Sequence, residues 1–186
     1  MLKHARVIGV GLILVMAVTV FMHSAAVRPA WADEIDDDAA AALRSLYEGS
    51  PAARVLGEKA AAILVFPNIV KAGFLFGAQF GEGTLFQGGR KVANYRSVAA
   101  SYGFQAGVQA FGYAMFLMTP AAVNYLNTSG GWEVGVGPSI VVVDTGGART
   151  LTTTTIQSDI YAFVFDQRGL MGGVGIQGSK ITRVNH

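Results

Sequence analysis

The chain has 186 residues, of which 52% are hydrophobic, and a formal net charge of +2. It contains no cysteine, which excludes disulfides, thiolate metal sites and cysteine nucleophiles. Three of its 14 basic residues lie in the first 32 positions, whereas all 12 acidic residues lie beyond them, so residues 33–186 carry a formal charge of −1. No basic stripe is interleaved with aromatic residues, which excludes nucleic acid as a partner.

Residues 1–32 have the pattern of a secretory signal peptide. A positively charged start precedes an apolar run over residues 7–22, and Ala30 and Ala32 form an A-x-A cleavage site. We expect cleavage near Ala32, which leaves residues 33–186 as one periplasmic or secreted domain without a cysteine for a lipid anchor. An uncleaved membrane anchor is the alternative, although the apolar run is short for a span of about 20 residues.

The next segments predict helices. A helix over 33–48 has acidic residues at its start and Gly49 at its end, and Ser50 and Pro51 open a second one. Their apolar stripes favour packing against a core, and the alternative is that both helices lie on a membrane surface. Thr119 and Pro120 open a short third helix that ends at Asn127.

Most of the remaining chain predicts strands joined by short turns. Turns are expected at Pro67 and Asn68, at Gly88 and Gly89, and at Gly146 and Gly147. Strands are expected over 63–66, 69–86 (bent near 71–73), 91–96, 102–118, 133–144, 151–156, 160–165, 169–176 and 179–184, the last three as two hairpins in series. The predicted class is therefore α+β, with a curved, glycine-rich, mostly antiparallel sheet or barrel and two or three packed helices.

Three of these strands alternate bulky apolar residues with glycine and glutamine. In the first, Phe74, Phe76 and Phe80 alternate with Gly77 and Gln79, and the pattern recurs over 102–110 and 170–177. Glycine gathered on one face indicates tight curvature or the close approach of another element or ligand. Because residues 97–132 carry no charge, a transmembrane helix is an alternative there, but the glycines and the alternation favour a strand buried on both faces.

Groups for catalysis or metal binding are scarce. His186 is the only histidine beyond residue 32, so a serine triad has no credible base. The sequence 173–178 matches a dinucleotide-binding glycine pattern but lacks its strand–helix context, and residues 36–38 lack calcium-loop spacing. Carboxylates beside turns or strand ends are the remaining candidates for a hydrolase: Glu82, Glu133, Asp144, Asp159 and Asp166. We predict no enzyme activity, no cofactor and no metal.

Basic residues near a predicted hairpin offer a lipid-binding site. Arg90 and Lys91 follow Gly88 and Gly89, at a tip where they could contact a phosphate headgroup, with Lys71 and Arg96 as further candidates. The alternative is that all four are ordinary solvated residues.

Four separated motifs resemble the SYLF-domain family. They lie at 76–83, 98–107, 130–139 and 161–181, and the resemblance covers about residues 40–184. It implies a lipid-binding module; fungal and animal relatives are linked to phosphoinositides, membranes and actin, and bacterial relatives are exported. Residues 94–98 depart from the segment found in eukaryotic members.

The expected function is accordingly an exported, non-enzymatic lipid- or phospholipid-binding domain acting at a membrane surface of the cell envelope. The alternative is a structural envelope protein that binds another protein or a polymer.

Overall fold

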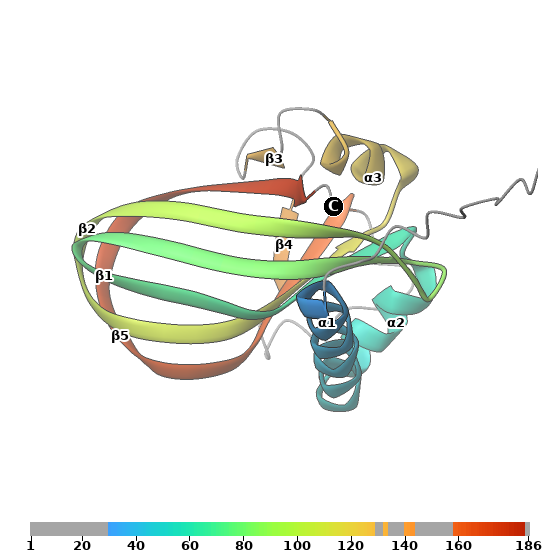
Figure 1. Cartoon of the computed structure of the whole chain (residues 1–186), viewed down its shortest axis with the longest axis horizontal. Helices are drawn as coiled ribbons and strands as arrows, with labels where there is room; N and C mark the ends of the chain where they lie inside the picture. The colour runs from blue at the N-terminus through green and yellow to red at the C-terminus, as the bar shows by residue number, and fades with distance from the viewer. Residues whose placement is uncertain (1–29, 129–131, 134–139, 144–157, 185–186) are drawn as a thin grey trace, which may run out of the picture.

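The structure, a computed structural model, describes residues 30–128, 132–133, 140–143 and 158–184 (Figure 1). Within these residues, helices pack on one sheet, which confirms the predicted α+β class. The elements are α1 (Ala30–Gly49), α2 (Pro51–Lys59), β1 (Ala62–Gln87), β2 (Arg90–Leu117), α3 (Pro120–Leu126), β3 (Trp132–Glu133), β4 (Ile140–Val143) and β5 (Ile160–Val184). The predicted turn at Gly146 and Gly147 and the strand over 151–156 lie outside the described residues.

The sheet has the strand order β1–β2–β5–β3, and β4 pairs with β5 in parallel. The other pairings among the described strands are antiparallel. The sheet is open, with β1 at one end of the order, so the barrel offered as an alternative to a curved sheet was wrong. β1, β2 and β5 contain 26, 28 and 25 residues, several times the usual strand length, and such strands must bend to form a compact domain.

β1 folds back over itself at Leu75. A Cβ atom on Gly81 would lie 2.6 Å from Cγ1 of Ile69, and one on Gly73 would lie 2.5 Å from Cα of Gly77. Both pairs are centred on Leu75, which has a φ of 62° and lies inside a register shift. The bend is therefore a few residues beyond the predicted position at 71–73.

β2 and β5 bend beside β1, so the sheet forms two layers that meet at one end of the molecule (Figure 1). The first layer consists of residues 62–74, 106–117 and 160–172, and the second of residues 76–87, 90–102 and 176–184. Gly107 and Gly169 have φ values of 140° and 84° on the bending strands. We call the end where the layers meet the bent end.

Three turns predicted from the sequence were wrong: the turn at Pro67 and Asn68 and the turns of the two hairpins predicted over 160–184. Pro67 and Asn68 lie at a register shift inside β1, and β5 is one continuous strand in place of two hairpins. Asp166, with a φ of 50°, and Gly169 redirect β5 without reversing it. The pairing with β2 continues on both sides of these residues, and this long-range pairing keeps the strand continuous.

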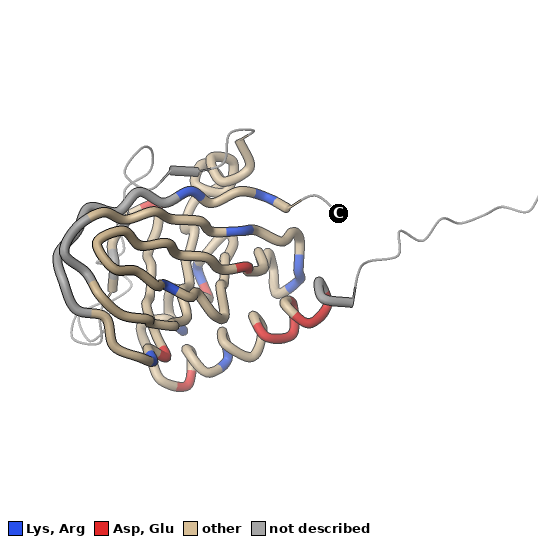
Figure 2. The backbone as a smooth tube through the Cα atoms, turned by 60° about the vertical axis from the view of Figure 1, so that its left-hand side comes forward, with Lys and Arg blue, Asp and Glu red and all other residues tan. Residues whose placement is uncertain are grey.

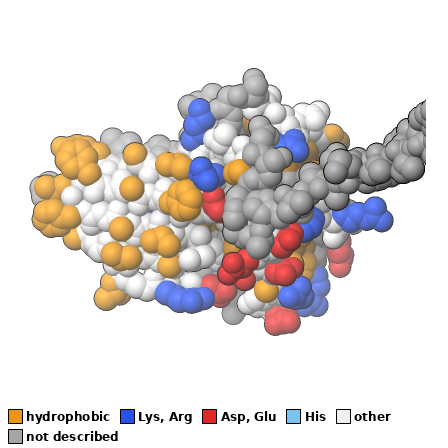
Figure 3. All heavy atoms as spheres, viewed as in Figure 1, with side chains coloured by type: hydrophobic (Ala, Val, Ile, Leu, Met, Phe, Trp, Pro, Cys, Tyr) orange, Lys and Arg blue, Asp and Glu red, His pale blue; other side chains and the backbone are white. Residues whose placement is uncertain are grey.

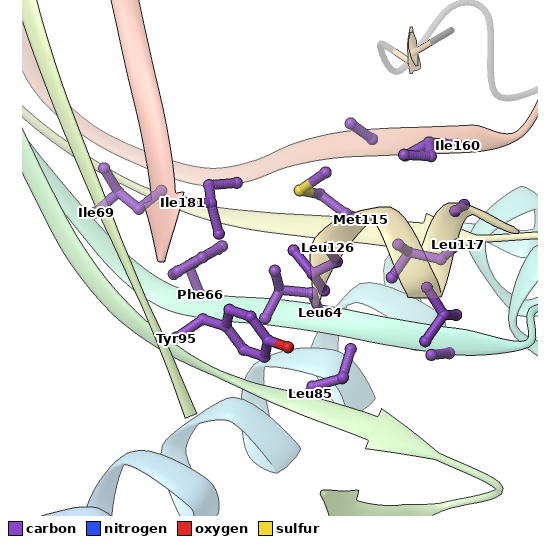
Figure 4. Packing of buried hydrophobic residues seen from close by; sticks show 14 residues of the cluster. Leu64, Phe66, Ile69, Leu85, Tyr95, Met115, Leu117, Leu126, Ile160 and Ile181 are labelled. Atoms are coloured by element: carbon purple, nitrogen blue, oxygen red, sulfur yellow. The ribbon is translucent and has the colours of Figure 1, made fainter. Parts of the chain in front are cut away.

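The space between the layers holds one core (Figure 4). Phe66 and Met115 of the first layer meet Tyr95 and Ile181 of the second, and Leu126 of α3 closes the side. A second core lies between α1, α2 and the first layer, with Leu46 and Leu56 among the helix residues and Phe116 and Phe163 among the strand residues. The helices therefore cover the first layer only away from the bent end, as Figure 1 shows.

The starts of α2 and α3 and the first hairpin follow the predicted chemistry, whereas α1 begins at Ala30, before the predicted start at residue 33. The backbone N–H groups of Ala53 and Ala122 donate to the side chains of Ser50 and Thr119, each over 3.2 Å. Gly88 and Gly89 both have positive φ, as a tight hairpin turn requires. No helix in the described part of the chain combines the length and apolar character needed to cross a membrane.

Candidate functional site

The predicted basic residue Lys91 takes part in holding α1 to the sheet. Its Nζ atom lies 2.7 Å from Oδ2 of Asp36 and 3.2 Å from Oδ1 of Asp33. Asp36 is 4% exposed although it lies in the acidic first part of α1, where the sequence pattern did not predict a buried carboxylate. Acidic residues gather along this helix (Figure 2). Lys91 is therefore occupied by an intramolecular ion pair, although its side chain is half exposed.

Asp36 is the centre of a buried hydrogen-bond cluster. Oγ1 of Thr84 and Nδ2 of Asn94 donate to its Oδ1 over 2.8 and 2.9 Å. Burial favours a higher pKa for Asp36, but the hydrogen bonds from Lys91, Asn94 and Thr84 and the charge of Lys91 together lower it. The carboxylate is thus held ionised at the contact between α1 and the second layer.

The other three predicted cations are spread over the sheet. Arg96 donates from Nη2 to Oε1 of Glu82 over 2.8 Å and lies 5.5 Å from the ring centroid of Phe80. Arg90 begins β2 at the exposed hairpin. Lys71 is partly buried in the first layer, opposite Gln109. The structure does not gather the four residues into one patch, and their role in lipid binding stays a prediction.

A different surface stands out at the bent end, where large apolar side chains face solvent. Phe74, Phe76 and Leu170 are 75%, 70% and 88% exposed. We define the apolar end as Val70, Phe74, Leu75, Phe76, Phe80, Val98, Tyr102, Val108 and Leu170. Soluble monomers rarely expose a contiguous apolar surface of this kind without a binding role.

The second layer carries one half of the apolar end. Phe76 is opposite Tyr102, Ala78 opposite Ala100, and Phe80 opposite Val98. Because side chains two residues apart share a face, these pairs form a continuous apolar row. The ring centroids of Phe76 and Tyr102 are 5.0 Å apart.

The first layer carries the other half. Val108 is opposite both Ala72 of β1 and Leu170 of β5, and Val70 is opposite Ala110. The apolar end therefore covers outward faces of both layers and the bend between them. A strand buried on both faces, the expectation for this part of β2, is wrong near Tyr102 and Val108, which are 63% and 60% exposed.

Apart from Lys71, which lies between Val70 and Ala72 and is partly buried, the segments that form the bent end carry no charge. Residues 72–81, 97–117 and 169–179 contain no Asp, Glu, Lys or Arg. Figure 3 shows hydrophobic side chains on the face of the bent end that it presents, and charged side chains nearer the helices. Arg168 and Lys180 border the apolar end, opposite Ala110 and Val98 respectively, and both are exposed.

The described glycine-rich face in the second half of β1 points inward. Gln79, Gly81 and Gly83 are buried toward the first layer, and a Cβ on Gly83 would collide with the backbone of Val65. The sequence pattern predicted either tight curvature or the close approach of another element at the glycines. The close approach of the first layer is confirmed for Gly81 and Gly83. The bulky residues are left on the outside, which the sequence pattern did not decide.

A cavity of about 450 Å³ lies between α1, α2 and the hairpin of β1 and β2. Gly88 and Gly89 line it, so it lies beside Arg90. Its charged lining residues are Arg44 and Glu58, one of each sign. It therefore offers no net preference for an anionic group, and the apolar end is the stronger candidate site.

Of the carboxylates considered for hydrolysis, the structure describes the side chains of Glu82, Asp159 and Asp166, the last of which is exposed on β5. Glu82 is paired with Arg96, and Oδ1 of Asp159 accepts from Oγ1 of Thr119 over 3.3 Å. Asp144 and the side chain of Glu133 lie outside the described part. Among the described residues, no group of three or more His, Asp or Glu side chains is placed to hold a metal ion.

Comparison with protein families finds a match to the model described as "Ysc84: Las17-binding protein actin regulator" over residues 98–186. The matched part begins in β2 and includes the motifs at 98–107, 130–139 and 161–181, whereas the motif at 76–83 lies before it. The predicted family resemblance is confirmed over this range. No curated protein matches the chain.

Proposed function

We propose that this protein, whose residues 98–186 match the Ysc84 (SYLF-domain) family model, is an exported, non-enzymatic domain that binds phospholipid at the cell envelope. The family is one of binding domains, which supports a role in binding. The signal-like residues 1–32 support export, with residues 33–186 as the mature domain.

The observation that carries this proposal is the exposure of the apolar end. Transferring one large apolar side chain from water to an apolar medium is worth roughly 1.5–3 kcal/mol. Three of the most exposed members, Phe74, Phe76 and Leu170, therefore offer several kcal/mol to any medium that covers them. A basic residue near an anionic surface contributes only about 1 kcal/mol. Apolar contact thus outweighs the predicted contribution of Arg90 and Lys91.

The second candidate is a structural envelope protein that binds another protein or a polymer. The description of the matched family, which names a Las17-binding protein, favours a protein partner. The same apolar end would serve such a partner, since aromatic residues are frequent at the centres of protein interfaces.

Vesicle co-sedimentation separates these candidates. Protein purified after export, with its N-terminus identified by mass spectrometry, is mixed with vesicles of phosphatidylcholine, phosphatidylethanolamine, phosphatidylglycerol or cardiolipin. We expect sedimentation with vesicles that largely persists at high salt, because apolar contact is not screened. Protein that stays in the supernatant with every lipid would overturn the proposal and favour the structural envelope protein.

A further inference from the structure

We infer that the apolar end enters one leaflet of a lipid bilayer with the bend foremost, and that Arg168 and Lys180 lie at the level of the lipid phosphates. This inference rests on the proposed lipid-binding function. In this inference the membrane contacts the apolar end, and not the hairpin residues Arg90 and Lys91.

The shape of the apolar end favours a surrounding medium over a flat partner. Phe76 and Tyr102 lie on the outer face of the second layer, and Val108 and Leu170 lie on that of the first. A flat protein surface docked on one layer would leave the other layer's apolar residues in water. Lipid acyl chains cover both layers and the bend at once.

The edge of the sheet at β1 limits how deeply the apolar end can insert into the bilayer. β1 is the terminal strand of the described sheet order, so no other described strand pairs with its second edge. Unpaired backbone groups are not tolerated in the hydrocarbon centre. Insertion is therefore restricted to the outer part of one leaflet, at about the 5–10 Å depth reached by interfacial helices.

Two basic residues border the inserted part at matching levels. Arg168 lies in register with Ala110 and through it with Val70, five residues before Leu75. Lys180 lies in register with Val98 and through it with Phe80, five residues after Leu75. At about 3.3 Å per residue, both levels are about 17 Å from the bend along the strands.

This spacing fits the dimensions of a leaflet. The headgroup region adds about 5–7 Å to the hydrocarbon on each side of a bilayer. A bend about 10 Å below the hydrocarbon surface thus places the levels of Arg168 and Lys180 among the phosphates. With Arg168 on the first layer and Lys180 on the second, both layers contact lipid phosphates at the same depth. This arrangement would favour insertion with the strands along the membrane normal.

Insertion depth is measured with nitroxide labels, which attach cleanly because the chain has no cysteine. Single variants Phe76→Cys and Leu170→Cys test the two layers, and Asn124→Cys on α3 is the control away from the bent end. With phosphatidylglycerol vesicles, we expect the first two labels to become accessible to oxygen and protected from a water-soluble nickel complex. The control label should stay in water. Bound protein with protection on only one layer, or on neither, contradicts the inference.

Affinity variants test the two kinds of contact. The double variant Phe76→Ser and Leu170→Ser alters exposed residues and should keep the denaturation midpoint while weakening vesicle binding at least tenfold. Arg168→Ala with Lys180→Ala should weaken binding to phosphatidylglycerol vesicles roughly tenfold at low salt, with little change on phosphatidylcholine. Arg44→Ala with Lys59→Ala removes the same charge from the helices and should have little effect.

The outcomes distinguish the inference from the function on which it rests. If the unaltered protein binds no vesicle, the proposed function fails. If it binds and the serine variant binds equally well, lipid binding stands and the apolar end is not its site. Sedimentation that reveals a dimer abolished by the serine substitutions would assign the end to a second copy of the chain.

Discussion

The Nζ atom of Lys91 lies 2.7 Å from Oδ2 of Asp36 and joins the start of β2 to a carboxylate of α1 that is 55 residues away in the sequence. Asp36 is buried, whereas Lys91 is half exposed. The contact changes what a substitution at Lys91 tests, because its loss removes a partner from a buried charge. Any binding defect in a variant that lacks both Arg90 and Lys91 would mix lipid contact with stability.

We expect Lys91→Ala to lower the free energy of unfolding by about 1–3 kcal/mol, since a buried ionised group then loses one of its hydrogen-bond donors. Arg90→Ala is the adjacent control and should stay within about 0.5 kcal/mol of the unaltered protein. Urea denaturation of both variants measures the difference. Equal midpoints would show that the Asp36 contact does not stabilise α1 on the sheet.

Stability should depend on the ionisation of Asp36 in acid. Its pKa is lowered in the folded protein, so the stabilisation is present above the unfolded-state value of 3.8 and is lost as the pH falls through the folded-state value. The difference in unfolding free energy between the unaltered protein and Asp36→Asn should therefore shrink below about pH 4. Denaturation midpoints at pH 7, 4 and 3 test this; a constant difference would refute it.

A second pH dependence is expected at the alkaline end. Burial raises the pKa of Tyr113 to about 12, above its ordinary value of 10.0. The stabilisation from keeping this phenol neutral is present below pH 10 and is lost toward pH 12, by up to about 1.4 kcal/mol per pH unit. Tyr113→Phe should lose less stability over this range. Parallel stability curves for the two proteins would contradict the assignment.

Glycine substitutions test the contact between the bent strands. A Cβ on Gly107 would meet the backbone of Leu170 and Met171, and its φ of 140° is unfavourable for other residues. Gly107→Val should therefore destabilise the protein by a few kcal/mol. Gly49→Ala is the control, because nothing lies within 4 Å of the added atom. Chemical denaturation is the measurement, and an unchanged midpoint for Gly107→Val would exclude crowding there.

Export gives a prediction that is independent of lipid. The mature protein should begin at Asp33, because Ala30 and Ala32 form the cleavage site. In the structure α1 begins at Ala30, just before this site. Mass spectrometry of the protein from the envelope fraction identifies its N-terminus. A majority species that starts at Met1 would favour the uncleaved membrane anchor.

Local sequence signals predicted the starts of α2 and α3 and the first hairpin, because their chemistry lies within a few residues. Ser50 and Thr119 cap helices through backbone groups three residues on, and Gly88 and Gly89 permit a tight turn by themselves. The continuity of β5 could not be predicted this way. Asp166 and Gly169 are compatible with a turn or with a bend, and pairing with distant β2 decides between them.

The candidate site, too, was predictable from the sequence only in part. The sequence alone determined that bulky and bare residues alternate along the strands and that the central segments carry no charge. Only the tertiary structure decided which face lies inside. Because β1 folds back at Leu75, the layers approach closely where Gly81 and Gly83 lack side chains, and Phe76 and Phe80 are left outside. A period of two places alternate side chains on opposite faces of a strand, but it does not determine which face is buried. The buried face is decided when a second layer packs against it.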